Sequence, residues 1–256
     1  MRLCVTLESD APDQWVPLSH LDLLQNSLDA LLPALPNRAH VAFSDLRVPG
    51  DRRHIDGERG LLFVGAGTLW WWLASPDDAF LAMLAERLAG DSIFCVGAAR
   101  FRVVGTATVP VPSLFAGTAG SVSARFSCWT PIVAAAPPGM GDEVRYHRLC
   151  PYPAPFLKRV GETLRETLAA HYSIEAGNKA KELCRLAFDT DYLARHRHSG
   201  AKRIIVSGEP ITGVLAPFVL TAPAAVLRAA WECGIGDRTK SGFGFISRVT
   251  APANAQ

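Results

Sequence analysis

The sequence lacks an apolar run long enough to cross a membrane. The best candidate, residues 61–74, is short and is interrupted by Gly65 and Gly67, whereas a bilayer-spanning helix needs about 20 consecutive apolar residues. The first residues also lack the apolar core and the small-residue cleavage site of a secretory signal, since they alternate between apolar and polar as a strand does. These absences predict a cytoplasmic protein with no membrane partner.

Cysteine patterns typical of zinc sites and of disulfide frameworks are also lacking. The six cysteines are scattered, without a Cys-x-x-Cys pair or a regular spacing, so we expect them to be reduced. The sequence contains no aspartate cluster and no set of histidines and cysteines with the spacing of a clear metal-binding motif. The sequence therefore predicts no metal site and no cofactor.

A large excess of charge of either sign is absent. Lysine and arginine number 26 against 24 aspartates and glutamates, which gives a net charge of +2. Such a small net charge still permits nucleic-acid binding where cations gather on one face, and residues 47–59 and 194–203 are locally basic. One basic loop is most often only a solvated loop. Two of them beside a basic, glycine-rich segment favour a polyanionic ligand.

What the chain does contain is an order of strands and helices that occurs twice. The first half predicts strands at 2–8, 40–48, 61–73 and 93–109, with helices at 21–32 and 76–88 that Ser19 and Ser75 would cap. The second half predicts strands at 122–134, 181–189, 203–220 and 242–249, the third bent into two arms at Gly208–Gly213, with helices at 156–172 and 223–233. Because β-α-β-β-α-β is the order of a ferredoxin-like fold, we predict an α+β protein with two tandem ferredoxin-like domains, residues 1–112 and 113–256.

The most distinctive motif is GIGDRTKSGFGF at residues 234–245. Its glycines surround a basic insert with Arg238 and Lys240: Gly234, Gly236, Gly242 and Gly244. Glycine permits positive φ and close approach of another group, and successive amides can form an anion-binding nest. The motif therefore indicates either a site for a phosphodiester backbone or a tight turn between helix and strand. A nucleotide-binding phosphate loop is disfavoured, because such a loop follows a strand and opens a helix.

In this context the sequence resembles the Cas6 endoribonucleases, the RNA-processing proteins of CRISPR systems. The resemblance rests on the glycine-rich motif, the preceding ITGVLAPFVLTAP, and the segments VPLSHLDLLQNSL, VAFSDL and LWWWLASPDDAFLAMLAERL, which span nearly the whole chain in the family's order. It implies a repeat-associated RNA-processing protein (RAMP superfamily) that cleaves precursor CRISPR RNA within the repeat, beside a stem-loop and without metal. The RNA's 2′-hydroxyl would attack the neighbouring phosphate and leave 2′,3′-cyclic phosphate and 5′-hydroxyl ends.

The resemblance also implies partners and a catalytic histidine. The partners are CRISPR repeat RNA, as precursor and as retained guide, and other Cas proteins of an effector complex. His40 is the histidine in the region after the first helix, where it would act as general acid or base, and Arg38 would stabilise phosphate charge. Asp29 or a neighbour occupies the place of the family's helix tyrosine. The shortened connection after this helix resembles a divergent, type IV-like branch, and a catalytically idle RNA-binding subunit of a CRISPR ribonucleoprotein is the alternative function.

The residues predicted to bind RNA come from the three basic segments. They are Arg52, Arg53, His54, Arg195, Arg197, His198, Lys202, Arg203, Gly234, Gly236, Arg238, Lys240, Gly242 and Gly244. Cationic side chains in such segments contact phosphates of an RNA stem, and the group around His54 could also reach the scissile phosphate.

Other histidines and aromatic residues have more ordinary interpretations. His20, at the start of the first helix, fits capping or packing better than catalysis. Alternation along a strand would bury Trp71 or its two neighbours, which favours core packing over base stacking for residues 70–72. For residues 146–148, Tyr-His-Arg in a proline-rich loop, exposure and function both stay open.

Overall fold

The computed structural model describes residues 1–32, 40–50, 53–63, 65–89, 93–117, 120–137, 146–149, 153–173, 184–196 and 200–249. The chain forms two compact units. The first holds residues 1–110 together with two short segments from farther along the chain, 204–210 and 240–242, and the second holds residues 111–203, 211–239 and 243–256. Within the described ranges, no helix is both long enough and apolar enough to span a bilayer.

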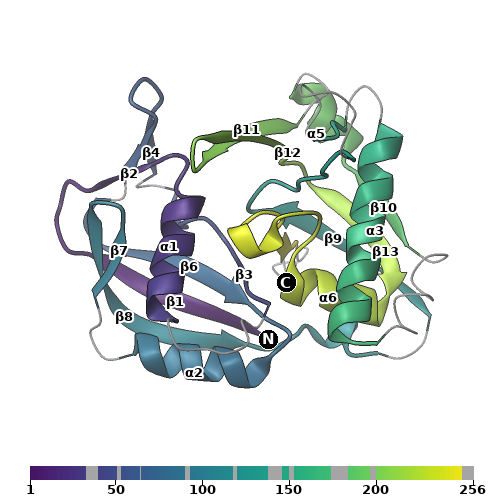
Figure 1. Ribbon diagram of the computed structural model, residues 1–256, viewed down its shortest axis with the longest axis horizontal. Helices are drawn as coiled ribbons and strands as arrows, with labels where there is room; N and C mark the ends of the chain where they lie inside the picture. Colours follow the sequence, from purple (N-terminus) through teal and green to yellow (C-terminus); the bar gives the residue numbers. More distant parts are fainter. Residues whose placement is uncertain are drawn as a thin grey trace, which may run out of the picture. The chain divides into compact units, whose positions relative to one another are not determined.

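The first unit is built around a five-stranded antiparallel sheet with the strand order β3-β6-β1-β8-β7 (Figure 1). Its elements are β1 (Arg2–Ser9), β2 (Trp15–Pro17), α1 (Leu21–Leu31), β3 (Ala42–Phe43), β4 (His54–Asp56), β5 (Leu61–Phe63), β6 (Thr68–Ala74), α2 (Asp78–Leu88), β7 (Ile93–Val96) and β8 (Ala99–Val109). Strand β1 lies in the middle, between β6 and β8, and β2, β5 and β4 form a small second sheet. This is the strand order of a ferredoxin-like fold with β7 added at one edge.

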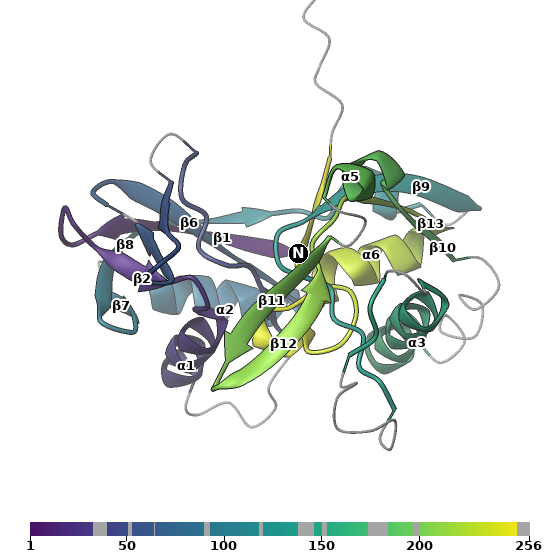
Figure 2. The same cartoon turned by 90° about the horizontal axis from the view of Figure 1, so that it is seen from above.

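The core of the first unit lies between the sheet and its two helices, which are on the same side of the sheet (Figure 2). On β6 the side chain of Trp71 is fully buried and packs against Phe43 and Phe94, with ring centroids 6.0 and 4.8 Å away. Trp70 keeps 37% of its surface exposed, because successive residues of a strand face opposite sides. Core packing is therefore confirmed for Trp71.

The ends of both helices differ from the predicted caps. Helix α1 follows His20, and the predicted cap Ser19 instead accepts a hydrogen bond through Oγ from the Ile205 amide (3.1 Å), on the segment 204–210 of the same unit. Helix α2 is capped by Asp77, whose carboxylate accepts from the Phe80 amide at 2.9 Å. Ser75 accepts from the Asp77 amide at 3.1 Å and lies two residues before the residue that caps the helix. Both predicted caps were wrong, because serine also forms local turns that precede a helix.

Two predicted long strands are each divided into a pair. The expected strand at 61–73 is β5 and β6, separated by a segment in which Gly65 and Gly67 have positive φ values of 53° and 96°. The expected strand at 93–109 is the hairpin of β7 and β8, which turns at Gly97 with φ of 61°. Glycine reaches this left-handed region without strain, so these three glycines lie where the chain leaves one strand and enters the next.

The second unit has a four-stranded antiparallel sheet with the order β10-β13-β9-β14. The elements of this half of the chain are η1 (Ser113–Phe115), β9 (Ser121–Cys128), α3 (Pro153–His171), β10 (Arg185–Phe188), α5 (Thr190–Arg195), β11 (Ala201–Val206), β12 (Glu209–Val214), β13 (Phe218–Pro223), α6 (Ala224–Cys233), η2 (Thr239–Ser241) and β14 (Ile246–Arg248). Of these, the parts of β11, β12 and η2 that fall in 204–210 and 240–242 belong to the first unit. Helices α3 and α6 pack on one side of this sheet (Figure 2). The strand order is again ferredoxin-like, so the predicted α+β fold with two tandem ferredoxin-like folds is confirmed.

An inserted hairpin, β11–β12, interrupts the second ferredoxin-like order between β10 and β13. Its two turn residues, Ser207 and Gly208, have φ values of 49° and 81°. Positive φ at both central positions suits the right-handed twist of a two-residue hairpin. The bend predicted within 203–220 is thus a hairpin turn, and β13 is a separate strand.

Candidate functional site

The glycine-rich loop at 234–245 owes its glycines to the protein's own atoms. All four have positive φ, from 65° at Gly244 to 85° at Gly236. A side chain on Gly236 would collide with the carbonyl oxygen of Val133, and one on Gly244 with the carbonyl oxygen of Ile235. At Gly242, within the first unit, an added Cβ would lie 2.5 Å from the Phe43 ring. Internal packing therefore explains these glycines without a phosphodiester backbone.

Several amides of this loop are also occupied. The amides of Ile235 and Asp237 donate to the carbonyls of Gly244 (3.0 Å) and Val133 (2.8 Å), and the Gly244 amide donates to the Pro131 carbonyl at 2.8 Å. These three groups are not available to an anion-binding nest. The exposed polar groups of the loop are instead the side chains of Arg238 and Lys240.

An ion pair fastens the loop to helix α3. The Asp237 carboxylate accepts hydrogen bonds from Arg159 Nη2 at 2.7 Å and Nε at 3.1 Å, and its Oδ2 also accepts from the Ala135 amide at 2.7 Å. Hydrogen bonding to Asp237 raises the pKa of the Arg159 guanidinium above its ordinary value. Beside the aspartate, Arg238 has φ of 60° and its guanidinium lies 5.6 Å from the centre of the Tyr146 ring. The ion pair between Arg159 and Asp237 thus fixes the backbone that carries the exposed side chain of Arg238.

We expect Asp237→Asn to lower the free energy of unfolding by about 2 kcal/mol, because the amide cannot form the charge-assisted pair with Arg159. Lys158→Ala, on the same helix, is the matched control. Lys158 is 79% exposed and reaches Glu162 only at 4.0 Å, so its loss should cost about 0.5 kcal/mol or less. Urea unfolding of the purified variants measures both. Equal stability of the two variants would contradict a stabilising role for the ion pair between Arg159 and Asp237.

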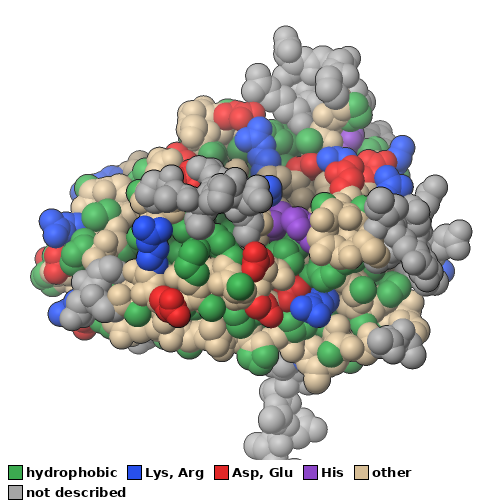
Figure 3. Space-filling view, turned by 60° about the horizontal axis from the view of Figure 1, so that its bottom comes forward, with side chains coloured by type: hydrophobic (Ala, Val, Ile, Leu, Met, Phe, Trp, Pro, Cys, Tyr) green, Lys and Arg blue, Asp and Glu red, His purple; other side chains and the backbone are tan. Residues whose placement is uncertain are grey.

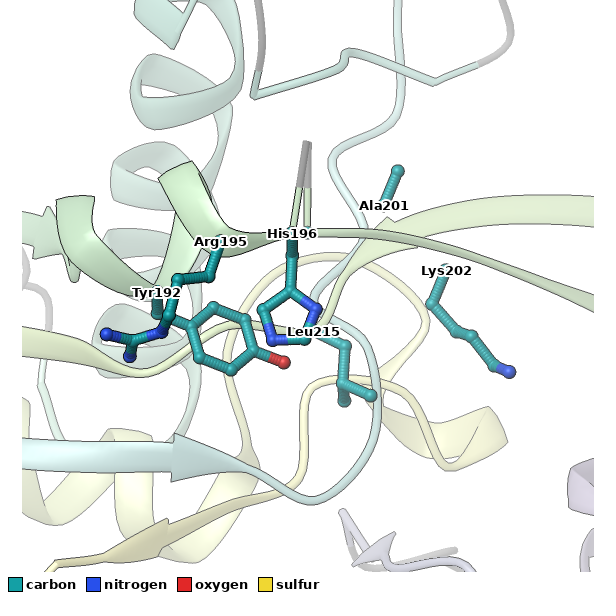
Figure 4. Close-up of a pocket in the computed structure, with 7 residues that line it drawn as sticks. Tyr192, Arg195, His196, Ala201, Lys202 and Leu215 are labelled. Atoms are coloured by element: carbon teal, nitrogen blue, oxygen red, sulfur yellow. The ribbon is translucent and has the colours of Figure 1, made fainter. Parts of the chain in front are cut away.

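A basic pocket lies in the second unit between α5 and β11 (Figure 4). It has a volume of about 330 Å³ and is lined by Tyr192, Arg195, His196, Gly200, Ala201, Lys202 and Leu215. The rings of Tyr192 and His196 are 4.2 Å apart between centroids, with 31° between their planes. Two predicted RNA-binding residues, Arg195 and Lys202, therefore share one pocket with an aromatic pair that the sequence analysis did not anticipate.

A second pocket adjoins the first at Ala201. It has a volume of about 280 Å³ and is lined by His147, Arg148, Leu149, Ala201, Thr212, Gly213 and Val214. The His147 amide donates to the Ala134 carbonyl at 2.8 Å, which holds this short segment against the unit. His147 and Arg148, which the sequence left open between exposure and function, thus border the basic pocket.

The predicted residues of the first unit differ in their exposure. His40 is buried, with 8% of its surface exposed. His54 is exposed on β4, where its ring meets Trp15 edge to face at 6.0 Å, and Arg53 beside it is exposed. Arg38, Arg52, Arg197 and His198 lie outside the described residues.

His20 has the packing role that the sequence predicted. It is 3% exposed, with Nδ1 2.7 Å from the Pro17 carbonyl and Nε2 accepting from the Leu46 amide at 3.1 Å. Burial lowers the pKa of this imidazole, which favours the neutral ring that donates through Nδ1 and accepts through Nε2. His20 therefore joins α1 to the segment after β3.

Charge on the visible surface is divided into small groups. On the face in Figure 3, basic side chains occur in separate groups, several of them beside acidic ones. Among the described residues, no three His, Cys, Asp or Glu side chains are grouped so that they could hold a metal ion.

Comparison with known proteins links this geometry to one family. Residues 118–247, more than half of the chain, match the family model for the C-terminal part of CRISPR-associated protein Cas6. A curated relative from Pyrococcus horikoshii, the putative CRISPR-associated endoribonuclease-like protein Cas6nc, is 23% identical over 88% of this chain and 86% of its own. Among solved structures, a CRISPR-associated protein Cas6 superposes with a TM-score of 0.75 at 20% identity, covering 98% of this chain and 99% of the other. A RAMP protein described as binding different RNA substrates gives 0.73 at 20% identity, covering 98% and 100%. The chain belongs to the Cas6 family.

Proposed function

We propose that this protein is an endoribonuclease that cleaves CRISPR repeat RNA. The observation that carries the proposal is the family match at residues 118–247, which includes both the glycine-rich loop and the basic pocket. The names of the similar proteins, an endoribonuclease-like relative and a RAMP protein that binds RNA, agree with it. In this proposal Arg238, Lys240, Arg195 and Lys202 contact RNA phosphates, because all four side chains are exposed cations.

The proposed reaction needs only groups of the protein and the RNA. The 2′-oxygen forms a bond to the adjacent phosphorus while the bond from phosphorus to the 5′-oxygen breaks. A base takes the proton of the 2′-hydroxyl, an acid supplies one to the departing 5′-oxygen, and a cation stabilises the charged transition state. The products are a 2′,3′-cyclic phosphate and a 5′-hydroxyl. We assign the acid or base role to His40 and the electrostatic role to Arg38.

A second function is supported by the burial of His40. Because only 8% of the surface of His40 is exposed, little of this residue is accessible to a substrate. A protein with the same basic surfaces and no catalytic acid or base would bind repeat RNA and leave it intact. The alternative is therefore an RNA-binding subunit of a CRISPR ribonucleoprotein.

Repeat RNA incubated with the full chain in EDTA separates these two functions. For the endoribonuclease we expect cleavage at one position, with a 2′,3′-cyclic phosphate on the upstream product. RNA with 2′-deoxyribose at that position should bind equally well and stay intact, because it lacks the attacking oxygen. A shifted but uncut natural repeat would support the binding subunit, and cleavage that requires added Mg²⁺ would contradict the proposed chemistry.

A further inference from the structure

We propose that the pocket between α5 and β11 holds one unpaired nucleotide of the bound RNA, with its base against the Tyr192–His196 pair and its phosphates beside Arg195 and Lys202. This inference rests on the proposed function and adds the kind of nucleotide that one part of the surface takes. Its lining residues include neither His40 nor any residue of the glycine-rich loop.

The size and the lining of the pocket suit a single nucleotide. Its volume of about 330 Å³ is at the lower end of the range for small-molecule sites. Gly200 and Ala201 line the pocket with little or no side chain, which leaves room for a ligand. Gly200 is also tightly packed, since an added Cβ would lie 3.0 Å from Leu193 Cδ2. Leu215 supplies an apolar surface between the polar groups (Figure 4). A paired base within a helix is shielded by its neighbours, so a site of this size favours an unpaired one.

The backbone that carries the aromatic pair is anchored at the start of helix α5. Tyr192 and His196 are one helical turn apart, at the end of the short helix α5. That helix is capped by Asp189, which accepts from the Tyr192 amide at 2.9 Å and pairs with Arg125 at 2.7 Å. Aromatic rings are the usual stacking platform for unpaired bases, whatever the base, and here the two rings already lie in contact.

The cations of the pocket flank the rings. In Figure 4 Arg195 lies on one side of Tyr192 and His196, and Lys202 lies on the other. The described residues place no carboxylate in the lining. Asp191 lies four residues before Arg195 on the same helix but is not part of the lining, and Asp189, which caps that helix, is paired with Arg125. Arg148 in the adjoining pocket extends the basic lining past Ala201. Aromatic faces between cations match a base joined to phosphates better than they match an anion alone.

Site-specific crosslinking tests the proposal on the full chain. Repeat RNAs carry 4-thiouridine or 6-thioguanosine at one unpaired position at a time, and mass spectrometry locates the adduct after irradiation. We expect one position to crosslink to Tyr192 or His196. Tyr192→Leu, which keeps bulk and removes the ring, should reduce that adduct at least fivefold and weaken RNA binding about tenfold. Tyr192→Phe should stay within twofold of the natural protein, and Arg87→Ala, an exposed arginine on α2, should change neither measurement.

The other possible outcomes distinguish a failure of the pocket proposal from a failure of the proposed function. If RNA binds and Tyr192→Leu changes neither affinity nor crosslinks, the pocket holds no nucleotide although the proposed function stands. If the natural protein binds no repeat RNA, the proposed function fails, and titration with adenosine and uridine monophosphates then tests the pocket alone. Saturable binding that Tyr192→Leu abolishes would support a site for a free nucleotide, and the absence of binding would overturn the pocket as well.

Discussion

Gly244→Ala is expected to lower the free energy of unfolding by about 4 kcal/mol or more, among the largest effects of a single substitution. Two causes act together. The residue has φ of 65°, which costs any L side chain energy, and the new Cβ would be driven into the Ile235 carbonyl, with the carbonyl carbon only 2.9 Å away. The backbone cannot simply retreat, because the amide of Gly244 is bonded to Pro131 and its carbonyl to the Ile235 amide.

Gly60→Ala separates these two causes. Gly60 has the same φ of 65°, and an added Cβ there would meet nothing within 4 Å. Its loss of stability should therefore be only the conformational cost, about 1 to 2 kcal/mol. Urea unfolding of both variants gives the difference, which measures the close approach at Gly244. Equal losses would mean that the loop adjusts freely. If Gly244→Ala does not fold while Gly60→Ala does, that result also agrees with the prediction.

The fold could be predicted because its elements follow local patterns. The alternation of β1 and β6, and the leucine spacing of α1 and α2, record which face of each element is buried. The errors occur where one residue type has several local uses. Ser75 lies close to the start of α2, but Asp77 is the residue whose side chain reaches the amide three positions on, and the sequence does not reveal which of two polar neighbours will do so.

The candidate site was predictable in its chemistry and not in its geometry. The spacing of glycines and cations at 234–245 is visible in the sequence, whereas the group that approaches Gly236 is a carbonyl from Val133, about a hundred residues earlier. Arg159 and Asp237 are likewise paired only by the fold. Glu232 combines both kinds of partner: its fully buried carboxylate pairs with Arg228 four residues earlier on α6, as helical spacing allows, and with Tyr172, which only the fold brings to it. Such partners come from tertiary packing, which periodicity cannot specify.

His40→Ala is expected to reduce the rate of repeat cleavage by about 100-fold or more, the usual contribution of a general acid or base. RNA affinity should stay within about threefold, because a residue that is only 8% exposed adds little to binding. The measurement is single-turnover cleavage of end-labelled repeat RNA with saturating protein, beside a binding titration with the 2′-deoxy substrate. A thermal melt of each variant shows whether loss of the buried ring has unfolded the first unit.

His54→Ala tests the competing histidine, since His54 is the exposed histidine on β4 beside Arg53 and belongs to the group that could reach the scissile phosphate. We expect it to cleave at close to the natural rate. His40→Gln, which keeps polar groups in the buried position and cannot exchange a proton near neutral pH, should be as slow as His40→Ala while folding better. If both His40 variants cleave normally and His54→Ala is slow, the acid or base is on β4. The buried histidine would then have only the structural role that its low exposure also permits.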